Sequence, residues 1–294
     1  MSLADEVTDP GSLADGLAEC GYLTEPGLAA ALFCAVRLPQ PLLLEGEAGV
    51  GKTQAAKSLA TLLDTPLIRL QCFEGIDAAE ALYEWNYPRQ LLGIRLAEAK
   101  GTDLAEESLF GPEYLIRRPL LAALEHPGPR PAVLLIDEVD RADEEFEAFL
   151  FELLAESTVT IPEIGTLTAT HPPIVVLTSN RTRDLHDALK RRCLYHWIDY
   201  PPLERATAIV RARVPQASTA LAAEVAGAVQ RLRSLDVQKQ PGVAEAIDWV
   251  QAAQLMGLET LDEAAVEATL GSVLKYREDH DVARAKGLAW VADG

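Results

Sequence analysis

Short apolar runs alternate with helical patterns over the first two hundred residues of this chain. Five segments predict strands, at residues 42–45, 67–71, 133–137, 174–179 and 196–200. Helical spacing is clearest in an apolar stripe that predicts a helix with a buried face, made of Phe146, Phe149, Leu150, Leu153 and Leu154. Because helical segments separate the strands, the pattern predicts an α/β fold, with a parallel sheet between two layers of helices.

Two insertions interrupt this alternation. Residues 158–161 and 166–169 alternate around the turn at 162–165, which predicts a β-hairpin. Residues 74–118 form a longer insertion that carries aromatic residues among charges, namely Tyr83, Trp85, Tyr87 and Tyr114. Either the part of the insertion around residues 83–89 contacts a client protein, because Tyr and Trp are enriched at interfaces, or its aromatics pack the insertion onto its own domain. The hairpin tip at 162–165 is the other candidate for client contact.

The strand signals stop after Pro201 and Pro202. Residues 203–294 have helical patterns separated by Pro and Gly, which predicts a helical lid domain. Residues 1–20 are polar and acidic, which predicts a mobile N-terminus. The α/β domain then spans residues 21–202.

Residues 46–53 contain a complete phosphate-binding loop of the form G-x-x-x-x-G-K-[ST]. An apolar strand precedes it and a helical pattern follows, as the mechanism of such loops requires. Backbone N–H groups of the loop surround the phosphates of ATP, Lys52 reaches the β and γ phosphates, and the Thr53 hydroxyl binds Mg²⁺. The predicted nucleotide-binding residues are Gly46, Glu47, Ala48, Gly49, Val50, Gly51, Lys52, Thr53 and Gln54.

Two carboxylates end the apolar run at 133–137. Ligands of parallel sheets bind at the carboxyl edge, so Asp137 is predicted to hold Mg²⁺ and Glu138 to activate the attacking water. Solvated acids at the end of a strand are the plain alternative. A phosphate loop about 85 residues earlier favours catalysis, so the sequence predicts an ATPase.

Asn180 follows the strand at 174–179, next to the predicted acid pair. A polar side chain there is suited to hydrogen-bond the attacking water and the γ-phosphate. The alternative is an Asn that begins a turn.

A short helical pattern at 187–193 ends in basic residues just before the fifth strand. Arg192, with Arg191 in reserve, is predicted to reach the γ-phosphate of a neighbouring subunit. The alternative is a basic helix terminus that interacts with its own dipole.

Composition narrows the functions further. The chain has 294 residues and a formal charge of −19, which argues against a broad nucleic-acid-binding surface. No apolar run is long enough for membrane insertion, and the N-terminus lacks the pattern of a signal peptide, so we expect a cytoplasmic protein. The four cysteines are scattered without metal-binding spacing, which favours buried or reduced thiols.

These motifs together resemble an AAA+ ATPase, a P-loop NTPase. The insertion after the second strand and the hairpin before the fourth resemble the helix-2 insert and pre-sensor hairpin of the MoxR group. The segment from Leu135 to Ala142 resembles that group's acid-pair segment. Residues 83–92 and 178–183 resemble the branch linked to maturation of carbon monoxide dehydrogenase. The resemblance covers about residues 25–255.

The resemblance implies a chaperone-like ATPase that forms a ring, expected to be a hexamer, and remodels a protein client. In the matching branch the client is a metalloenzyme, a molybdenum hydroxylase. MoxR proteins often work with a partner that carries a von Willebrand factor A domain. One position departs from the group: Val243 stands where relatives carry a second-sensor arginine in the lid, with Lys239 nearby.

Two other functions fit the same fold. A nucleic-acid-directed motor would need basic residues on the hairpin. Residues 158–170 contain no Lys or Arg, and their one charged residue is the acidic Glu163. A nucleotide-dependent switch without turnover would not need Glu138. An ATP-driven protein remodeller is therefore the preferred interpretation.

Overall fold

The computed structural model describes residues 7–101, 106–156 and 158–293, and it divides into two compact units. The first unit consists of Met1–Leu13, Pro26–Leu44 and Leu59–His196. The second consists of Ala14–Glu25, Glu45–Ser58 and Trp197–Gly294. Each unit therefore draws on separate stretches of chain, and the predicted domain boundary after residue 202 stays a prediction.

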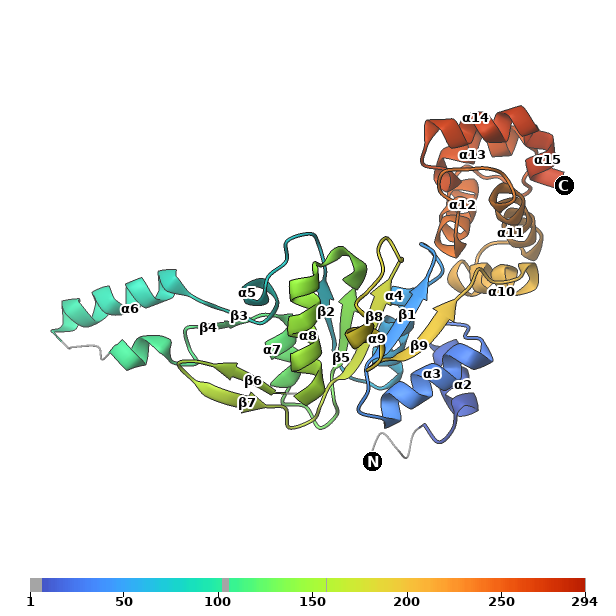
Figure 1. Ribbon diagram of the computed structural model, residues 1–294. Helices are drawn as coiled ribbons and strands as arrows, with labels where there is room; N and C mark the ends of the chain where they lie inside the picture. The colour runs from blue at the N-terminus through green and yellow to red at the C-terminus, as the bar shows by residue number, and fades with distance from the viewer. Residues whose placement is uncertain (1–6, 102–105, 157, 294) are drawn as a thin grey trace. The chain divides into compact units, whose positions relative to one another are not determined.

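A five-stranded parallel sheet with the order β2-β5-β8-β1-β9 confirms the predicted fold class (Figure 1). The strands are β1 (Leu42–Gly46), β2 (Leu67–Gln71), β5 (Val133–Asp137), β8 (Ile174–Ser179) and β9 (Leu194–Ile198). In register, Gln71 lies opposite Asp137, and Ile136 lies opposite Leu177. The carboxyl ends of β2, β5 and β8 therefore meet at one edge of the sheet.

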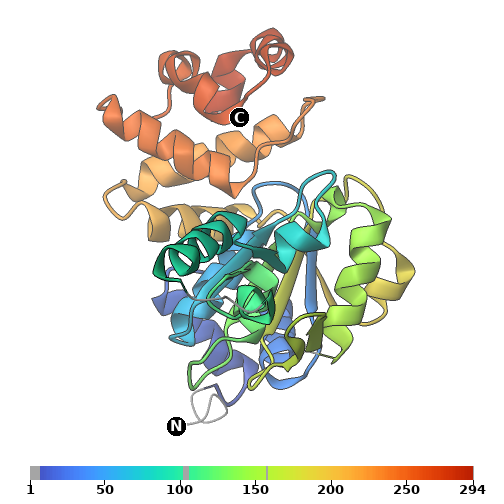
Figure 2. The same cartoon turned by 90° about the vertical axis from the view of Figure 1, so that its left-hand side faces the viewer.

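Helices flank the strands of the sheet (Figure 2). They include α3 (Pro26–Arg37), α4 (Lys52–Leu62), α7 (Pro119–Leu124) and α8 (Glu144–Glu156). The stripe predicted on α8 does pack into the core: Phe146, Leu150 and Leu153 are buried against strands β5 and β8 and their neighbours. Burial of these side chains is the main force that holds α8 on the sheet.

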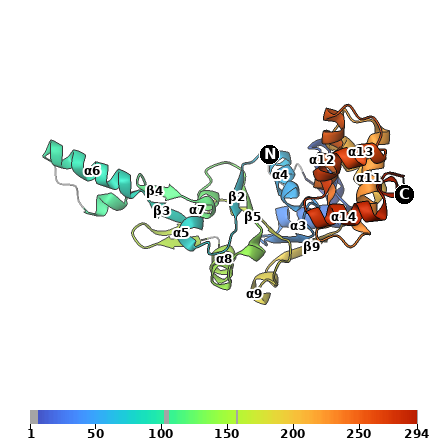
Figure 3. The same ribbon diagram turned by 90° about the horizontal axis from the view of Figure 1, so that it is seen from above.

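The two insertions form small antiparallel pairs. Strands β6 (Thr158–Ile161) and β7 (Gly165–Thr168) make the predicted hairpin. The longer insertion contains α5 (Ala78–Ala81), β3 (Tyr83–Trp85), α6 (Tyr87–Lys100), the 3₁₀ helix η1 (Glu106–Phe110) and β4 (Leu115–Arg117). Strand β3 pairs with β4, and α6 lies beyond this pair, at the far end of the insertion (Figures 1 and 3).

Aromatic packing holds the base of the longer insertion together. The ring of Trp85 packs edge-on against Phe110 at 5.2 Å and against Tyr83 at 6.2 Å, measured between ring centroids. Trp85 is buried, with 7% of its surface exposed, and Ile164 of the hairpin turn packs on the same core. Internal packing therefore holds for Trp85, and client contact through its ring is wrong, whereas Ile164 is only partly buried and client contact through the hairpin tip stays a prediction.

The C-terminal helices surround a core of their own, as the sequence pattern predicts. They are α10 (Leu203–Arg213), α11 (Thr219–Arg233), α12 (Val243–Leu255), α13 (Glu263–Val273), α14 (Arg277–Lys286) and α15 (Leu288–Asp293). Trp249 is fully buried at the centre, and its indole N–H donates to the Thr269 hydroxyl at 2.6 Å. That hydroxyl in turn donates to the Ala265 carbonyl, so the buried polar groups are satisfied.

The expectation of a mobile segment over residues 1–20 is wrong for most of its described part. Helix α2 (Pro10–Glu19) forms there, and residues 1–6 lie outside the described residues. Leu13 and Leu17 are fully buried because their i, i+4 spacing places them on one helix face. Three acidic residues and two glycines hide this short stripe in the sequence between residues 9 and 19.

Two further boundaries differ from the sequence prediction. Strand β9 begins at Leu194 and not at 196, because the Leu194 N–H donates to the Pro41 carbonyl at the start of β1. Helix α9 (Asp187–Lys190) ends before 193. The Arg192 and Cys193 N–H groups bond to carbonyls three residues earlier, and such 3₁₀-type bonds tighten and close the final turn.

Candidate functional site

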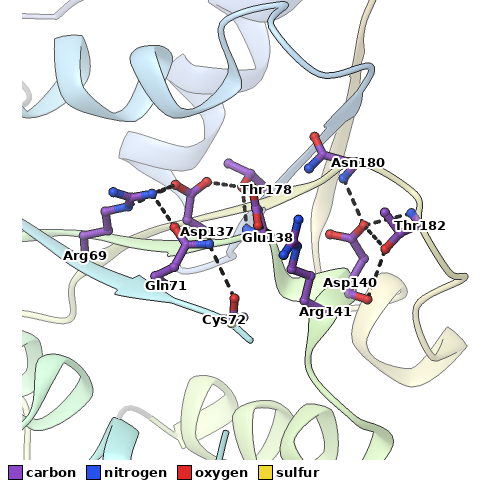
Figure 4. A network of polar contacts seen from close by, with 10 residues as sticks. All are labelled: Arg69, Gln71, Cys72, Asp137, Glu138, Asp140, Arg141, Thr178, Asn180 and Thr182. Atoms are coloured by element: carbon purple, nitrogen blue, oxygen red, sulfur yellow. Dashed lines mark hydrogen bonds and ion pairs between the residues drawn. The ribbon is translucent and has the colours of Figure 1, made fainter. Parts of the chain in front are cut away.

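The acid pair lies at the carboxyl end of β5, inside the first unit (Figure 4). Asp137 is buried, with 3% of its surface exposed, whereas the Glu138 side chain is 32% exposed. Glu138 has a φ of 56°, a left-handed conformation that turns the chain sharply out of the strand and into the 3₁₀ helix η2 (Val139–Arg141). Asp137 and Glu138 are adjacent in sequence, yet the first carboxylate is buried and the second is partly exposed beyond this turn.

Thr178 joins the two acids. Its hydroxyl donates to Asp137 Oδ1 at 2.5 Å and accepts a bond from the Glu138 N–H at 2.9 Å. Thr178 is almost fully buried on β8, one position beyond the pairing of Leu177 with Ile136. Sequence reasoning did not assign Thr178 a role, although the parallel register of β5 and β8 would have placed it opposite Asp137.

Each carboxylate of the pair also contacts an arginine. Arg69, on β2, donates from Nε at 3.0 Å and from Nη2 at 2.6 Å to Asp137 Oδ2. Arg141 places its Nε 2.7 Å from Glu138 Oε2, across one turn of η2. Neither arginine was predicted from the sequence, because each one alone reads as an ordinary charged residue.

Asp140 fixes the loop that follows β8. Its Oδ2 accepts from the Asn180 N–H at 3.2 Å, and from the Thr182 N–H at 2.8 Å and hydroxyl at 2.7 Å. The side-chain amide of Asn180 points away from Asp140 in Figure 4. The backbone N–H of Asn180 is therefore bonded to Asp140, two residues after the acid pair. The Asn180 side-chain amide takes no part in this contact.

Arg191 and Arg192 lie at the amino end of β9, whereas the acid pair lies at the carboxyl end of β5, three strands away in the sheet. Both arginines are exposed, and Arg191 Nη2 is 4.0 Å from the Asp187 carboxylate. They border a cavity of about 350 Å³ beside Pro39 and Cys193. The chain thus keeps these two arginines apart from its own acid pair.

The cysteines near these residues are neutral thiols. Burial first, and the charge of Asp137 second, raise the pKa of Cys72 to about 12. Burial also raises the pKa of Cys193 to about 12. Because only the thiolate binds metal or attacks substrate, these two groups are inert at neutral pH.

The phosphate loop belongs to the second unit, with Glu45–Ser58. Gly49 and Gly51 have φ values of 77° and 100°, which residues with a side chain rarely adopt. Lys52 is buried, and its Nζ donates to the carbonyls of Gly46 at 2.6 Å and Glu47 at 2.7 Å. The lysine therefore folds back over the loop that carries it.

The lid helix α12 contacts this loop through its backbone. The N–H groups of Val243 and Ala244 donate to the Gly49 carbonyl at 3.1 Å and 3.2 Å. Glu245 Oε2 accepts from the Gly242 N–H at 2.8 Å and closes the first turn of α12. Val243 thus contacts the loop through its N–H group, while its side chain is buried.

Replacing Gly242 with Ala should weaken ATP binding by roughly tenfold. A Cβ at Gly242 would lie 2.8 Å from the backbone of Gly49, so the loop or the helix must move, and such overpacking costs about 1–3 kcal/mol. Isothermal titration with ATP measures the effect. Gly271→Ala is the matched control, because a Cβ there meets nothing closer than 4.0 Å. Equal affinities in both variants would show that the contact between loop and lid is irrelevant to nucleotide binding.

Each unit offers an oxygen atom of the kind that Mg²⁺ prefers. In the first unit Asp137 has a buried carboxylate, and in the second unit Thr53 has a hydroxyl in the first turn of α4. Mg²⁺ prefers hard oxygen ligands and needs only one or two from the protein when phosphates supply others. Within residues 7–101, 106–156 and 158–293, no cluster of three His, Cys, Asp or Glu residues is arranged to hold a metal by itself.

A family model for the AAA domain of the dynein-related subfamily matches residues 41–193, just over half of the chain. The matched region begins before the phosphate loop, contains the acid pair and Asn180, and ends after Arg192. The chain therefore belongs to this family of AAA domains, and by class it is an ATPase.

Comparison with individual proteins adds a distant relative. The chain is 26% identical over 203 residues to the denitrification regulatory protein NirQ of Stutzerimonas stutzeri. The aligned region covers 67% of this chain and 64% of NirQ. The match thus spans less than two thirds of that protein's length.

Solved structures with a similar backbone are more distant in sequence. The RuvB Holliday junction branch migration motor of Thermotoga maritima has a TM-score of 0.47 and 16% identity, covering 87% of this chain and 68% of RuvB. Domain III of the replication initiation protein DnaA of Thermotoga maritima has a TM-score of 0.47 and 15% identity, covering 86% of this chain and 95% of that domain. Likenesses of this size do not indicate what this chain binds.

Among the residues that the structure describes, none forms a helix with the length and apolar character needed to cross a bilayer.

Proposed function

We propose that this chain is an ATP-driven remodeller of the MoxR type, and that its client is a metalloenzyme of the molybdenum hydroxylase class. It would act as a ring, expected to be a hexamer, together with a partner that carries a von Willebrand factor A domain. The observation that carries the remodelling part is an exposed apolar surface on α6, within the insertion outside the central sheet.

This surface, called the α6 surface below, consists of four large side chains that are at least half exposed. They are Tyr87, Leu91, Leu92 and Leu96, with exposed fractions of 60%, 60%, 58% and 51%. Tyr87 with Leu91, and Leu92 with Leu96, form two i, i+4 pairs along the helix, and exposed apolar area of this kind often marks a surface that binds a partner. Because Trp85 packs internally, the proposed client contact moves from residues 83–89 to α6, which begins at Tyr87.

In the proposed reaction, the loop residues 46–54 hold ATP, and Lys52 leaves the Gly46 and Glu47 carbonyls to bind the β and γ phosphates. Mg²⁺, when bound, would neutralise negative charge on the phosphates of ATP. Thr53 and Asp137 would supply its protein oxygens. The bond from Thr178 to Oδ1 orients the Asp137 carboxylate for this role.

Glu138 is the proposed base. To act, its carboxylate must leave Arg141 and accept a proton from the attacking water, while the Thr178 bond holds its backbone in place. The Asn180 amide, held by the Asp140 contact to its backbone, would orient that water. Arg192, with Arg191 in reserve, would act on the ATP of the adjacent subunit.

Capture of the client tests the proposal. A Glu138→Gln ring held in ATP should retain a partly assembled molybdenum hydroxylase on a pull-down, and the same ring without nucleotide should release it. Retention that is equal with and without ATP would contradict an ATP-driven cycle. Retention of a transcription regulator in its place would favour a regulatory role, which the name of the relative NirQ suggests for that protein.

The α6 surface provides the sharper prediction. The double substitution Leu91→Ser with Leu92→Ser should lower client activation by at least about 30-fold, as expected when interface anchors are lost. Basal ATPase activity should stay within twofold, because exposed substitutions change stability by only about 0.5 kcal/mol. Leu255→Ser is the matched control, since Leu255 is 90% exposed in the C-terminal helices. Full client activation in the double variant would move the client surface elsewhere.

A further inference from the structure

Arg69 forms the closest arginine contact to the metal-binding acid that the structure describes. Two of its nitrogens bond to the same oxygen, Asp137 Oδ2, at 3.0 Å and 2.6 Å. Gln71, two residues along β2 and so on the same face of the strand, accepts a further bond from Arg69 Nη2. Gln71 therefore braces the guanidinium in its position on the carboxylate.

Burial differs sharply between the two partners. The Asp137 side chain is 4% exposed, whereas that of Arg69 is 47% exposed. A buried charge without a partner is costly, so the Arg69 guanidinium at Oδ2 offsets the cost of burying the Asp137 carboxylate. The half-exposed guanidinium can swing into solvent at little cost, because its charge remains hydrated after it leaves.

We propose that Arg69 is a resident counter-ion of Asp137 that competes with Mg²⁺, so that metal loading must break the Arg69–Asp137 pair. The inference rests on the proposed role of Asp137 as a metal ligand. A guanidinium bonded to Oδ2 occupies lone pairs that a metal would need, and a like charge nearby opposes Mg²⁺. Arg69 therefore raises the Mg²⁺ concentration at which the site fills, and it is a positioning residue for Asp137.

The opposite role for Arg69 is a direct contact with phosphate, which arginine also favours. The two roles predict opposite signs. A competitor makes the metal harder to bind, whereas a phosphate ligand strengthens binding of the nucleotide with its metal. A change in Mg²⁺ requirement therefore separates them without any measurement of hydrolysis.

The test is a titration of Mg²⁺ against binding of fluorescent ADP to the full-length chain. Arg69→Met should lower the half-saturating Mg²⁺ concentration by roughly fivefold, the change expected for an ion pair with one exposed partner. Arg69→Lys should stay close to the wild type, since it keeps the charge. Arg117→Met, which removes an exposed ion pair with Glu125, should have no effect. Arg69→Gln serves as a second variant if Arg69→Met fails to fold.

An unchanged or raised Mg²⁺ requirement in folded Arg69→Met or Arg69→Gln protein would overturn the inference. Asp137→Asn separates this failure from that of the proposed metal site. If Asp137→Asn raises the requirement and the Arg69 variants do not lower it, only the competition is wrong. If Asp137→Asn leaves the requirement unchanged, the metal role of Asp137 fails as well.

Discussion

Glu138→Gln should bind ATP with near wild-type affinity and hydrolyse it about 10²–10⁴-fold more slowly, the usual cost of removing a general base. Gln has the same size, so the backbone bond to Thr178 and the turn at Glu138 should persist. Its amide cannot accept a proton from water. The Glu138 carboxylate is half-buried, with 32% of its side chain exposed, and is paired with Arg141, so this ion pair must open before Glu138 can act on water.

Lys52→Ala should give the opposite result, with ATP binding itself lost. Each charged hydrogen bond is worth about 1.5–3 kcal/mol, so loss of two such bonds to phosphate predicts a weakening of roughly 10²-fold or more. Equilibrium binding of a fluorescent ATP analogue and release of phosphate should be measured on both variants. Normal hydrolysis by Glu138→Gln would remove Glu138 from the mechanism, and normal binding by Lys52→Ala would remove the lysine from the phosphate site.

Arg192→Ala should lower turnover by roughly 10³-fold or more while nucleotide affinity stays nearly intact, as for other trans-acting arginines. The physical reason is position. Arg192 is exposed at the amino end of β9, and the acid pair of the same chain lies at the carboxyl end of β5. A head-to-tail contact in a ring brings different surfaces of two subunits together, which allows Arg192 to serve the neighbouring ATP.

Mixing inactive subunits separates action in trans from a local defect. Arg192→Ala subunits keep an intact phosphate loop, and Lys52→Ala subunits keep an intact arginine. Mixed rings should regain hydrolysis, because some interfaces then pair the two intact parts. Arg117→Ala subunits serve as the control and should be active by themselves. If mixed rings form and stay inactive, Arg192 does not act across the interface, and Arg191 should be tested in the same way.

Apolar patterning allowed most of the sheet to be predicted. Strands β2, β5 and β8 match the predicted ranges. Strands β5 and β8 begin with continuous apolar runs, the usual signature of a buried strand in a parallel sheet, whereas β2 carries Arg69 and Gln71 among its apolar residues. The hairpin of β6 and β7 was also predictable from alternation around a turn. Helix α2 was missed because its buried face consists of two residues, Leu13 and Leu17, and two positions are too few to give a clear helical pattern.

The polar contacts of the site were less accessible to sequence reasoning. Asp137 and Glu138 end an apolar strand, so their place at the sheet edge followed from pattern. The hydrogen bonds from Thr178 and Arg69 to Asp137 depend on which strands are neighbours in the sheet. The strand order β2-β5-β8 cannot be predicted from the local sequence of each strand. The packing of Trp85 likewise depends on Phe110, which lies 25 positions away in the chain.

The most direct test of the whole account is ATP-dependent activation of a purified, incompletely assembled molybdenum hydroxylase. The wild-type ring with ATP and Mg²⁺ should restore enzyme activity, and the Glu138→Gln ring should not, although it binds both ATP and client. The same activation by Glu138→Gln, or activation by the wild-type ring without ATP, would contradict the claim that this chain uses ATP hydrolysis to remodel its client.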